Sequence, residues 1–201
     1  MADRGFPGRD EVRDDLLRRW SEPHRRYHDR RHLREVLAAL PADAPDVVLL
    51  AAWYHDAVYD PTRDDNERAS ARLARAQLTG RVSEATVTEV ERLVLLTQSH
   101  EVSPGDGTGA MLSDADLAVL GAAPERYDEY ARDIRQEYAH VGEDDFRHGR
   151  MQVLRGLLAH EPLYVTEPGR RRWEFAARSN LNRELARLQA GGPSDGAAPP
   201  G

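Results

Sequence analysis

An imidazole and a carboxylate stand side by side at His55 and Asp56, inside the most apolar segment of the chain. Burying such groups is costly unless they are paired or bind a metal. His32 lies 23 residues before His55, and Asp116 lies 60 residues after Asp56. Two imidazoles and two carboxylates form a mixed nitrogen and oxygen donor set, which suits a divalent cation such as Mn, Fe, Co, Ni or Zn. The pattern therefore favours a metal-dependent hydrolase over a buried ion pair or a core histidine.

The composition of the chain excludes several classes of binding site and catalytic group. The chain has 201 residues and a net charge of −7, which argues against a nucleic-acid-binding protein because such proteins carry a basic face. It contains neither cysteine nor lysine, so thiolate metal sites, cysteine nucleophiles and lysine Schiff bases are excluded. No stretch approaches the roughly 20 apolar residues of a membrane span, and the N-terminus lacks a secretory signal. We therefore expect a cytoplasmic protein with no membrane segment.

The elements that must position these side chains are expected to be helices throughout. Apolar residues recur at helical spacing, and no segment alternates as a strand does, so the predicted class is all-α. We expect helices over residues 10–20, 27–40, 46–58, 64–78, 83–99, 124–140, 143–160 and 174–188. A polar loop is expected over residues 103–109, and a short helix from 113 to 121 would carry Asp114 and Asp116. Residues 1–190 are predicted to form a single domain, followed by a disordered tail over 191–201 that is too poor in apolar residues to fold.

Several strings of the sequence, in their order along a helical chain, resemble one known family. They are YHDRRHL at 27–33, WYHDAVYD at 53–60, DNERAS at 65–70, DADLAVLG at 114–121, GR at 149–150 and ARSNL at 177–181. The chain is similar to the HD superfamily of metal-dependent phosphohydrolases, in particular to a bacterial branch of predicted HD phosphohydrolases. The resemblance covers about residues 24 to 188 and implies an HD-domain helical bundle.

The resemblance also implies the metal ligands. It assigns them to His32, His55, Asp56 and Asp116. Asp116 is preferred to Asp114 because the distal aspartate of the family usually stands in an Ala-Asp-Leu triplet, and Asp114 would then cap the start of its helix. Other branches bind a second metal through extra histidines, but only His100 lies in the interval concerned, so we expect one divalent ion, with Mn, Co, Ni, Fe, Mg and Zn left open.

Two acidic residues are candidates for catalysis. Asp60 stands four residues after Asp56, one turn away if the helix persists, and some HD hydrolases use an acidic residue at this offset to orient the attacking water. The alternative is a carboxylate that caps the turn at Pro61. Glu67 is the second candidate, although an acidic residue there also suits an ordinary helix N-terminus.

Four further residues are candidates for substrate binding. His28 lies one turn before His32 on the same face, where it could reach a phosphate, support the metal ligands from outside or face solvent. Asn66 stands beside Glu67. His100 could donate to a phosphate, or it could simply suit a helix C-terminus. Arg150 is the arginine chosen as a bidentate phosphate clamp, because Gly149 would allow close approach.

The predicted function is a metal-dependent phosphohydrolase that uses a metal-activated water on a nucleotide or another small phosphate ester. The substrate class comes from the resemblance alone, and the oligomeric state is left open, with a homo-oligomer among the alternatives. Two other functions remain open. One is a non-catalytic metal- or nucleotide-binding module in regulation, and the other is an HD-fold di-iron oxygenase, which the small number of suitably placed histidines disfavours.

Overall fold

A computed structural model describes residues 6–7 and 10–191. Helices connected by turns and loops make up the described chain, and no strand occurs within those residues, so the prediction of an all-α protein is confirmed. The predicted disordered tail lies, apart from Gly191, outside the described residues. Among the described helices, none has the length and apolar content that crossing a membrane would require.

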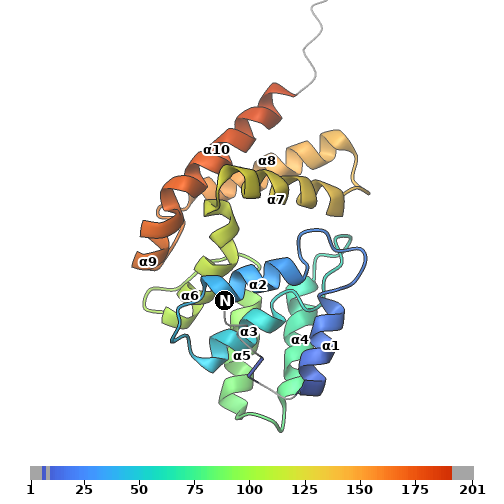
Figure 1. The fold of residues 1–201 in the computed structure, drawn as a ribbon, viewed down its shortest axis with the longest axis vertical. Coiled ribbons are helices and arrows are strands. Elements are labelled where there is room, and N and C mark those ends of the chain that lie inside the picture. The colour runs from blue at the N-terminus through green and yellow to red at the C-terminus, as the bar shows by residue number, and fades with distance from the viewer. Residues whose placement is uncertain (1–5, 8–9, 192–201) are drawn as a thin grey trace, which may run out of the picture.

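The helices form two groups, one above the other in Figure 1. The lower group consists of α1 (Asp10–Arg19), α2 (Arg30–Ala39), α3 (Asp46–Tyr54), α4 (Asn66–Leu78), α5 (Glu84–Leu96) and α6 (Gly107–Asp116). The upper group consists of α7 (Pro124–Glu137), α8 (Glu143–Ala159), α9 (Glu167–Gly169), the π-helical turn η2 (Arg170–Glu174) and α10 (Phe175–Ala190). The 3-10 turn η1 (Leu117–Gly121) leads from α6 toward α7.

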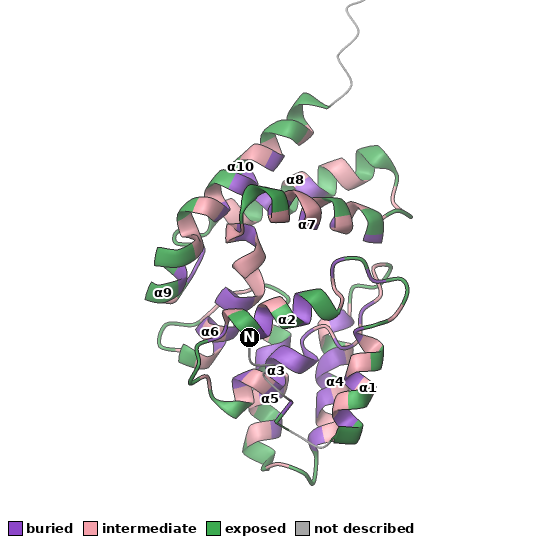
Figure 2. Ribbon diagram, in the orientation of Figure 1, coloured by how far each residue is buried: buried purple, intermediate pink, exposed green. Residues whose placement is uncertain are grey.

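Each group has its own buried cluster. The lower cluster is centred on α3, which is buried on nearly all sides and stands out in Figure 2 for that reason. The upper cluster joins α7, α8 and α10, and it includes Leu120 of η1 and Tyr27 from the loop that follows α1. Tyr27 therefore links the lower chain to the upper core.

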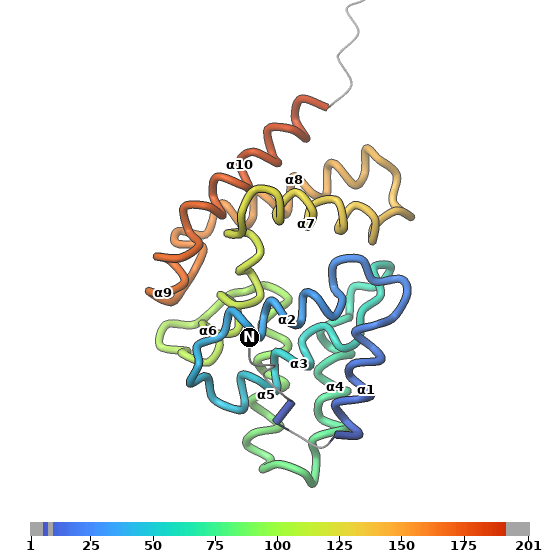
Figure 3. The backbone as a smooth tube through the Cα atoms, in the orientation of Figure 1, coloured from blue at the N-terminus to red at the C-terminus, as the bar shows by residue number. Residues whose placement is uncertain are grey.

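Two loops lie side by side beneath the C-terminal end of α7, as the tube in Figure 3 shows. One joins α1 to α2 and the other follows α3. The buried guanidinium of Arg25 ties them together, because its Nη1 donates to the backbone oxygen of His28 at 2.9 Å and to that of Asp56 at 2.8 Å. These two loops carry or flank most of the predicted site residues.

Helix α2, which contains His32, starts later than expected. The prediction began it at residue 27, but α2 begins at Arg30. Asp29 is the cap: its backbone is extended, and its carboxylate accepts from the backbone N–H of Arg31 and of His32. Residues 27–28 are held instead by Glu137 at the end of α7.

The central helix ends earlier than predicted, at Tyr54 rather than residue 58. Two side chains of α4 supply the hydrogen bonds that a longer helix would have made. The Ser70 hydroxyl bonds the N–H and C=O of Val58, and the Asn66 amide bonds the N–H and C=O of Asp60. Because the backbone polar groups are satisfied in this way, the chain can leave the helix directly after the histidine.

The predicted loop at 103–109 was partly wrong. Helix α6 begins at Gly107, and the Asp106 carboxylate accepts from the N–H of Gly109 at 2.8 Å. A Cβ at position 109 would lie 2.3 Å from that carboxylate, so the capping contact requires glycine. Glycine is a weak helix former, which is why the sequence suggested a loop here.

Candidate metal centre

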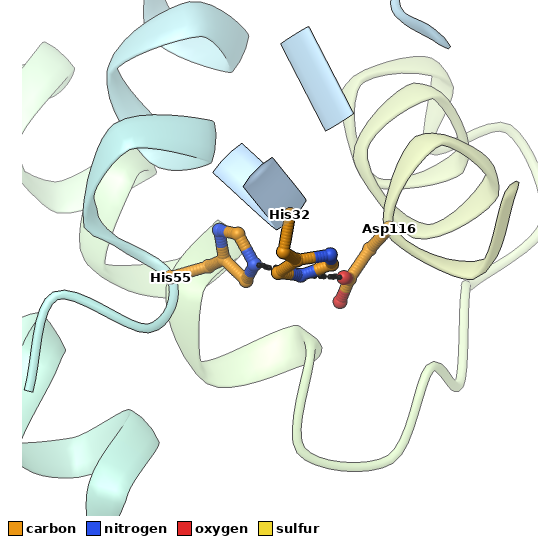
Figure 4. Close-up of side chains that lie close together, drawn as sticks. All are labelled: His32, His55 and Asp116. Atoms are coloured by element: carbon orange, nitrogen blue, oxygen red, sulfur yellow. Dashed lines mark hydrogen bonds and ion pairs between the residues drawn. The ribbon is translucent and has the colours of Figure 1, made fainter. Parts of the chain in front are cut away.

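The side chains of His32, His55 and Asp116 converge between α2, α3 and α6 (Figure 4). His32 lies in the first turn of α2, His55 follows the last residue of α3, and Asp116 is the last residue of α6. All three therefore sit at helix ends, where a side chain can reach past its own helix. Both imidazoles are almost completely buried, with 2% and 1% of their side-chain surface exposed.

The distances between the ligand atoms fit one bound cation. The two Nε2 atoms lie 3.1 Å apart, and Oδ1 of Asp116 lies 3.1 Å from His32 and 3.5 Å from His55. Oδ2 of Asp56 lies 3.2 Å from Nε2 of His55 and 3.7 Å from that of His32. Metal bonds to such atoms are about 2.0–2.2 Å long, so ligands that share an ion lie about 3.0–3.6 Å from one another. His32, His55 and Asp116 could thus hold a metal ion, as predicted, and Asp56 stands next to them without belonging to that three-residue group.

The protonation of His55 suits the same role. Its Nδ1 lies 2.8 Å from the carbonyl oxygen of Ala52. A carbonyl can only accept, so Nδ1 carries a proton, and Nε2 is the ring nitrogen that faces the cluster and is available to a metal once it is deprotonated. Fixing a ligand histidine through its second nitrogen is the usual arrangement around protein-bound metals.

The charges of the cluster favour a cation at its centre. Burial alone would lower the pKa of His55, but the carboxylates of Asp56 and Asp116 outweigh it and raise that pKa well above the usual value. Burial would raise the pKa of each aspartate, but the imidazoles, His55 foremost, hold both values well below the usual range. A proton or a metal ion can satisfy this demand for positive charge, so metal binding should release protons.

Aromatic rings enclose the ligands on their buried side. The Trp20 ring centroid lies 5.3 Å from that of His55, and the Tyr27 ring centroid lies 4.6 Å from that of His32. The indole N–H of Trp20 donates to the carbonyl of Trp53 at 3.0 Å, which fixes the ring in place. These contacts hold the imidazoles in single orientations.

A cavity of about 290 Å³ opens beside the cluster. Its walls include two of the ligands and several other polar side chains: His28, Asp56, Tyr59, Arg63, Asp64, Asn66, Glu67, Thr97, Gln98, His100, Asp116 and Tyr138. Two candidate ligands thus line a cavity, and a catalytic metal site needs such an open position beside its ligands.

Glu67, one of the two predicted catalytic residues, lies in this wall. Burial and the nearby charges of Asp56 and Asp116 raise the pKa of its carboxyl, which its own backbone N–H and His28 only partly offset. A carboxyl group whose pKa is raised, beside a candidate metal site, is suited to proton transfer.

Two predicted substrate-binding histidines also reach the cavity. Nδ1 of His28 lies 2.6 Å from Oε2 of Glu137. Nδ1 of His100 lies 3.1 Å from the Ser113 hydroxyl, and its Nε2 lies 3.6 Å from Oδ2 of Asp116. His100 has a φ of 56°, in the left-handed region that L-residues rarely adopt, and such conformations concentrate at functional sites.

Asp60 lies away from the cluster. Because α3 ends at Tyr54, the helical turn that would have brought Asp60 beside Asp56 is absent. Its Oδ1 accepts from the backbone N–H and hydroxyl of Thr62, and the residue lines a neighbouring cavity of about 480 Å³. This is the turn-capping arrangement that the sequence left open as the alternative.

Asn66 and Arg150 have structural partners. The Asn66 side chain lines the cavity, but its amide is bonded to the backbone of Asp60 on both sides. Arg150 is only 7% exposed and lies in the upper cluster, where its Nε lies 2.7 Å from Oε1 of Glu184. The predicted phosphate clamp is thus directed to a buried carboxylate and does not line the cavity.

Asp116, rather than Asp114, accompanies the two histidines. Asp114 faces the other way and accepts from the backbone N–H of Val165 at 2.7 Å and of Thr166 at 2.8 Å. It does not cap its own helix, because α6 begins seven residues earlier at Gly107. The expected cap for Asp114 was therefore wrong, whereas the preference for Asp116 agrees with the geometry.

Sequence reasoning missed three residues that hold the site together: Arg25, Ser70 and Glu137. Arg25 and Ser70 fix the backbone around His28, Asp56 and Val58. Arg25 is one of 28 basic residues, and nothing in its local pattern distinguishes it. Ser70 stands in the DNERAS string, which was the signal that could have pointed to it. Its partner, the backbone of Val58, lies 12 residues earlier in the chain, so the contact itself could not be predicted.

Comparison with known proteins adds no relative: no protein-family model, curated protein or solved structure matches the chain.

Proposed function

We propose that the protein is a metal-dependent phosphohydrolase of the HD type that acts on a small phosphate ester. The observation that carries the proposal is the convergence of His32, His55 and Asp116, whose ligand atoms lie 3.1–3.5 Å apart beside a polar cavity. Oδ2 of Asp56 lies 3.2 Å from Nε2 of His55, next to this group. The resemblance of the sequence strings to the HD superfamily supports the same assignment.

A divalent cation held by these residues would acidify water and withdraw negative charge from a phosphoryl group. The protein supplies the remaining groups. Glu67, with its raised pKa, takes or returns a proton at the attacking or leaving oxygen. His28 and His100 face the phosphoryl oxygens with ring nitrogens, and the partly exposed carboxylates of Asp56 and Asp116 would bind the cation.

The cavity favours a small substrate. Its volume of about 290 Å³ accommodates a phosphate group and part of the attached molecule, and a nucleotide would extend beyond it. Carboxylates and the net charge of −7 repel a polyanion, so a monoester with one phosphate group fits better than a nucleic acid.

The test is phosphate release from a panel of nucleotides and simple phosphate esters. Metal-stripped protein is compared with protein refilled separately with Mn, Co, Ni, Mg, Zn or Fe. The variant Asp56→Asn should abolish release, whereas Asp43→Asn, which makes the same change of charge at an exposed loop, should leave it intact. Tight metal binding without release from any ester would overturn the proposal and favour the regulatory module.

A further inference from the structure

The carboxylate of Glu137, the last residue of α7, is surrounded by hydrogen-bonding groups next to the cavity. Its side chain is fully buried. Oε1 accepts from three consecutive backbone N–H groups, those of Arg26, Tyr27 and His28, at 2.8, 2.8 and 2.9 Å. Oε2 accepts from the hydroxyl of Tyr59 at 3.0 Å and lies 2.6 Å from Nδ1 of His28.

The two carboxylate oxygens of Glu137 have different partners. The three backbone groups occupy Oε1 and fix the loop before α2, a task that any acceptor of the same shape would perform. Oε2 is directed to the His28 ring. Three backbone N–H groups and the Tyr59 hydroxyl donate to this carboxylate, and four such donors stabilise its ionised form.

The bond at Oε2 determines which ring nitrogen of His28 carries the proton. A carboxylate only accepts, so Nδ1 must donate. The ring is also held in place by aromatic contacts. It stacks on Tyr59 with centroids 4.1 Å apart, and the Tyr27 ring meets it edge-on at 4.8 Å. His28 lines the cavity, and Nε2 is the nitrogen left for a substrate.

We propose that Glu137 is a positioning residue: it keeps the Nδ1 proton of His28 toward itself, so that Nε2 is presented to the phosphoryl group of the substrate. The inference rests on the proposed function for its kinetic consequence, but the tautomer of His28 can be measured without turnover. A purely structural role would require the bonds at Oε1 and the bond from the Tyr59 hydroxyl at Oε2, but no particular tautomer of His28.

The variant Glu137→Gln separates the anchoring of the loop from the positioning of His28. The three backbone N–H groups demand an acceptor, so the amide oxygen must take the place of Oε1 and the NH₂ group must take that of Oε2. The NH₂ group then donates one hydrogen to Nδ1 of His28 and the other to the Tyr59 hydroxyl, which changes from donor to acceptor. The imidazole can accept that bond only with its proton on Nε2, so the tautomer should switch while the loop remains anchored.

The direct measurement is ¹⁵N NMR of histidine-labelled, Zn-loaded protein, with His28 assigned by comparison with His28→Ala. At a pH where His28 is neutral, we expect the proton on Nδ1 in the wild type and on Nε2 in Glu137→Gln. A wild-type proton on Nε2 would overturn the inference, and this result requires no variant to fold. An unchanged tautomer in a folded Glu137→Gln protein would also overturn it.

Kinetics provide the second measurement. Glu137→Gln should lower kcat on the order of 100-fold, the scale of a misdirected proton-transfer group, with zinc affinity unchanged. Because Glu137 acts through His28, it should have no further effect on kcat in a His28→Ala background. Additive effects of the two substitutions would contradict the inference.

Glu174→Gln is the matched control. Glu174 also accepts backbone N–H groups, those of Leu163 and Tyr164, and it does not line the cavity. It should leave both the His28 tautomer and kcat unchanged, and a loss of kcat as large as that of Glu137→Gln would contradict a specific role for Glu137. If wild-type protein releases no phosphate from any ester, the proposed function fails, but the tautomer measurement still decides whether Glu137 positions His28.

Discussion

Asp114 and Asp116 stand two residues apart on α6, and their carboxylates have different partners. Asp116 meets the two imidazoles between α2 and α3, whereas Asp114 accepts from the N–H groups before α9. Asp116 is therefore placed where its carboxylate could bind a cation, whereas Asp114 anchors a loop. The pair provides a controlled experiment within a single helix.

Asp116→Asn should weaken metal binding by about 100-fold or more, because it removes a charged ligand rather than an outer partner. Asp114→Asn should leave metal affinity unchanged but lower the free energy of unfolding by about 1–3 kcal/mol, the cost of poorly satisfied buried donors. Competition titrations and urea unfolding measure the two effects. Equal losses of metal affinity in the two variants would contradict the assignment of Asp116.

His100 carries backbone strain at the cavity wall. Its φ of 56° follows the end of α5, and its N–H donates to the carbonyl of Leu96 at 2.9 Å, a position where glycine is the usual residue. His100→Gly and His100→Ala both remove the imidazole, but only glycine relieves the strain. We expect the glycine variant to be more stable than the alanine variant by about 1 kcal/mol, measured by urea unfolding.

The same pair of variants tests whether the His100 imidazole takes part in the reaction. Both should lose activity to a similar extent, because both lack the ring that faces the cavity. If the alanine variant kept wild-type turnover, His100 would have no part in the reaction. If glycine were no more stable than alanine, the left-handed backbone would carry no cost.

At the residue scale, the sequence predicted the types of ligand and the residues of the candidate cluster. It could not predict that Asp60 would turn away, because that depends on where α3 ends. The end of α3 is decided by Ser70 and Asn66, which lie on another helix and bond the departing backbone. Side-chain direction beyond a helix end is thus a tertiary property.

At the scale of elements, α8 and α10 are joined by a buried ion pair. The guanidinium of Arg150 lies 2.7 and 3.1 Å from the two oxygens of Glu184 and donates to the hydroxyl of Tyr130 at 3.1 Å. The Tyr127 hydroxyl donates to the same carboxylate at 2.5 Å. The arginine that the sequence suggested as a phosphate clamp therefore has a partner in the upper cluster.

Arg150→Met should lower the free energy of unfolding by about 3–5 kcal/mol, because Glu184 would remain buried without its counter-charge. Adding Glu184→Gln should restore part of that loss. The value of KM for a phosphate ester should remain unchanged in the folded single variant. A raised KM with little loss of stability would instead support the phosphate clamp.

Element existence was predicted well, and element boundaries less so. Apolar spacing located the helices, but α2, α3 and α6 each begin or end at a place that their local sequence did not indicate. The Asp29 side chain caps the N-terminus of α2, and the Glu137 carboxylate accepts a hydrogen bond from the backbone N–H of His28 just before it. A hydrogen-bond partner more than 100 residues away in the chain cannot be inferred from the residues next to the helix end.

At the scale of the whole molecule, Glu137 joins the upper group of helices to the loops of the lower one. Burial alone would raise the pKa of this carboxyl, but the bonds from His28 and from the backbone lower it to about 2 from an ordinary value of 4.5. A pKa lowered by folding means that the ionised form stabilises the fold above about pH 4.5. That contribution, about 3 kcal/mol, is lost as the pH falls from about 4.5 to about 2.

The acid prediction can be checked with urea unfolding of metal-free wild type and Glu137→Gln at pH 6 and pH 3. The wild type should be the more stable protein at pH 6, and the gap should shrink markedly at pH 3. A gap of the same size at both values of pH would show that the charge of Glu137 does not contribute to the stability of the fold.

Metal occupancy measured against phosphate release in the same samples tests the central claim most directly. Metal-stripped protein is titrated with Mn²⁺, bound metal is counted per chain, and release is followed for an ester that the panel has identified. We predict that release rises in proportion to occupancy and reaches its maximum at one ion per chain, with neither binding at these concentrations nor release in Asp116→Asn. Release from metal-free protein, or full occupancy without release, would contradict the account.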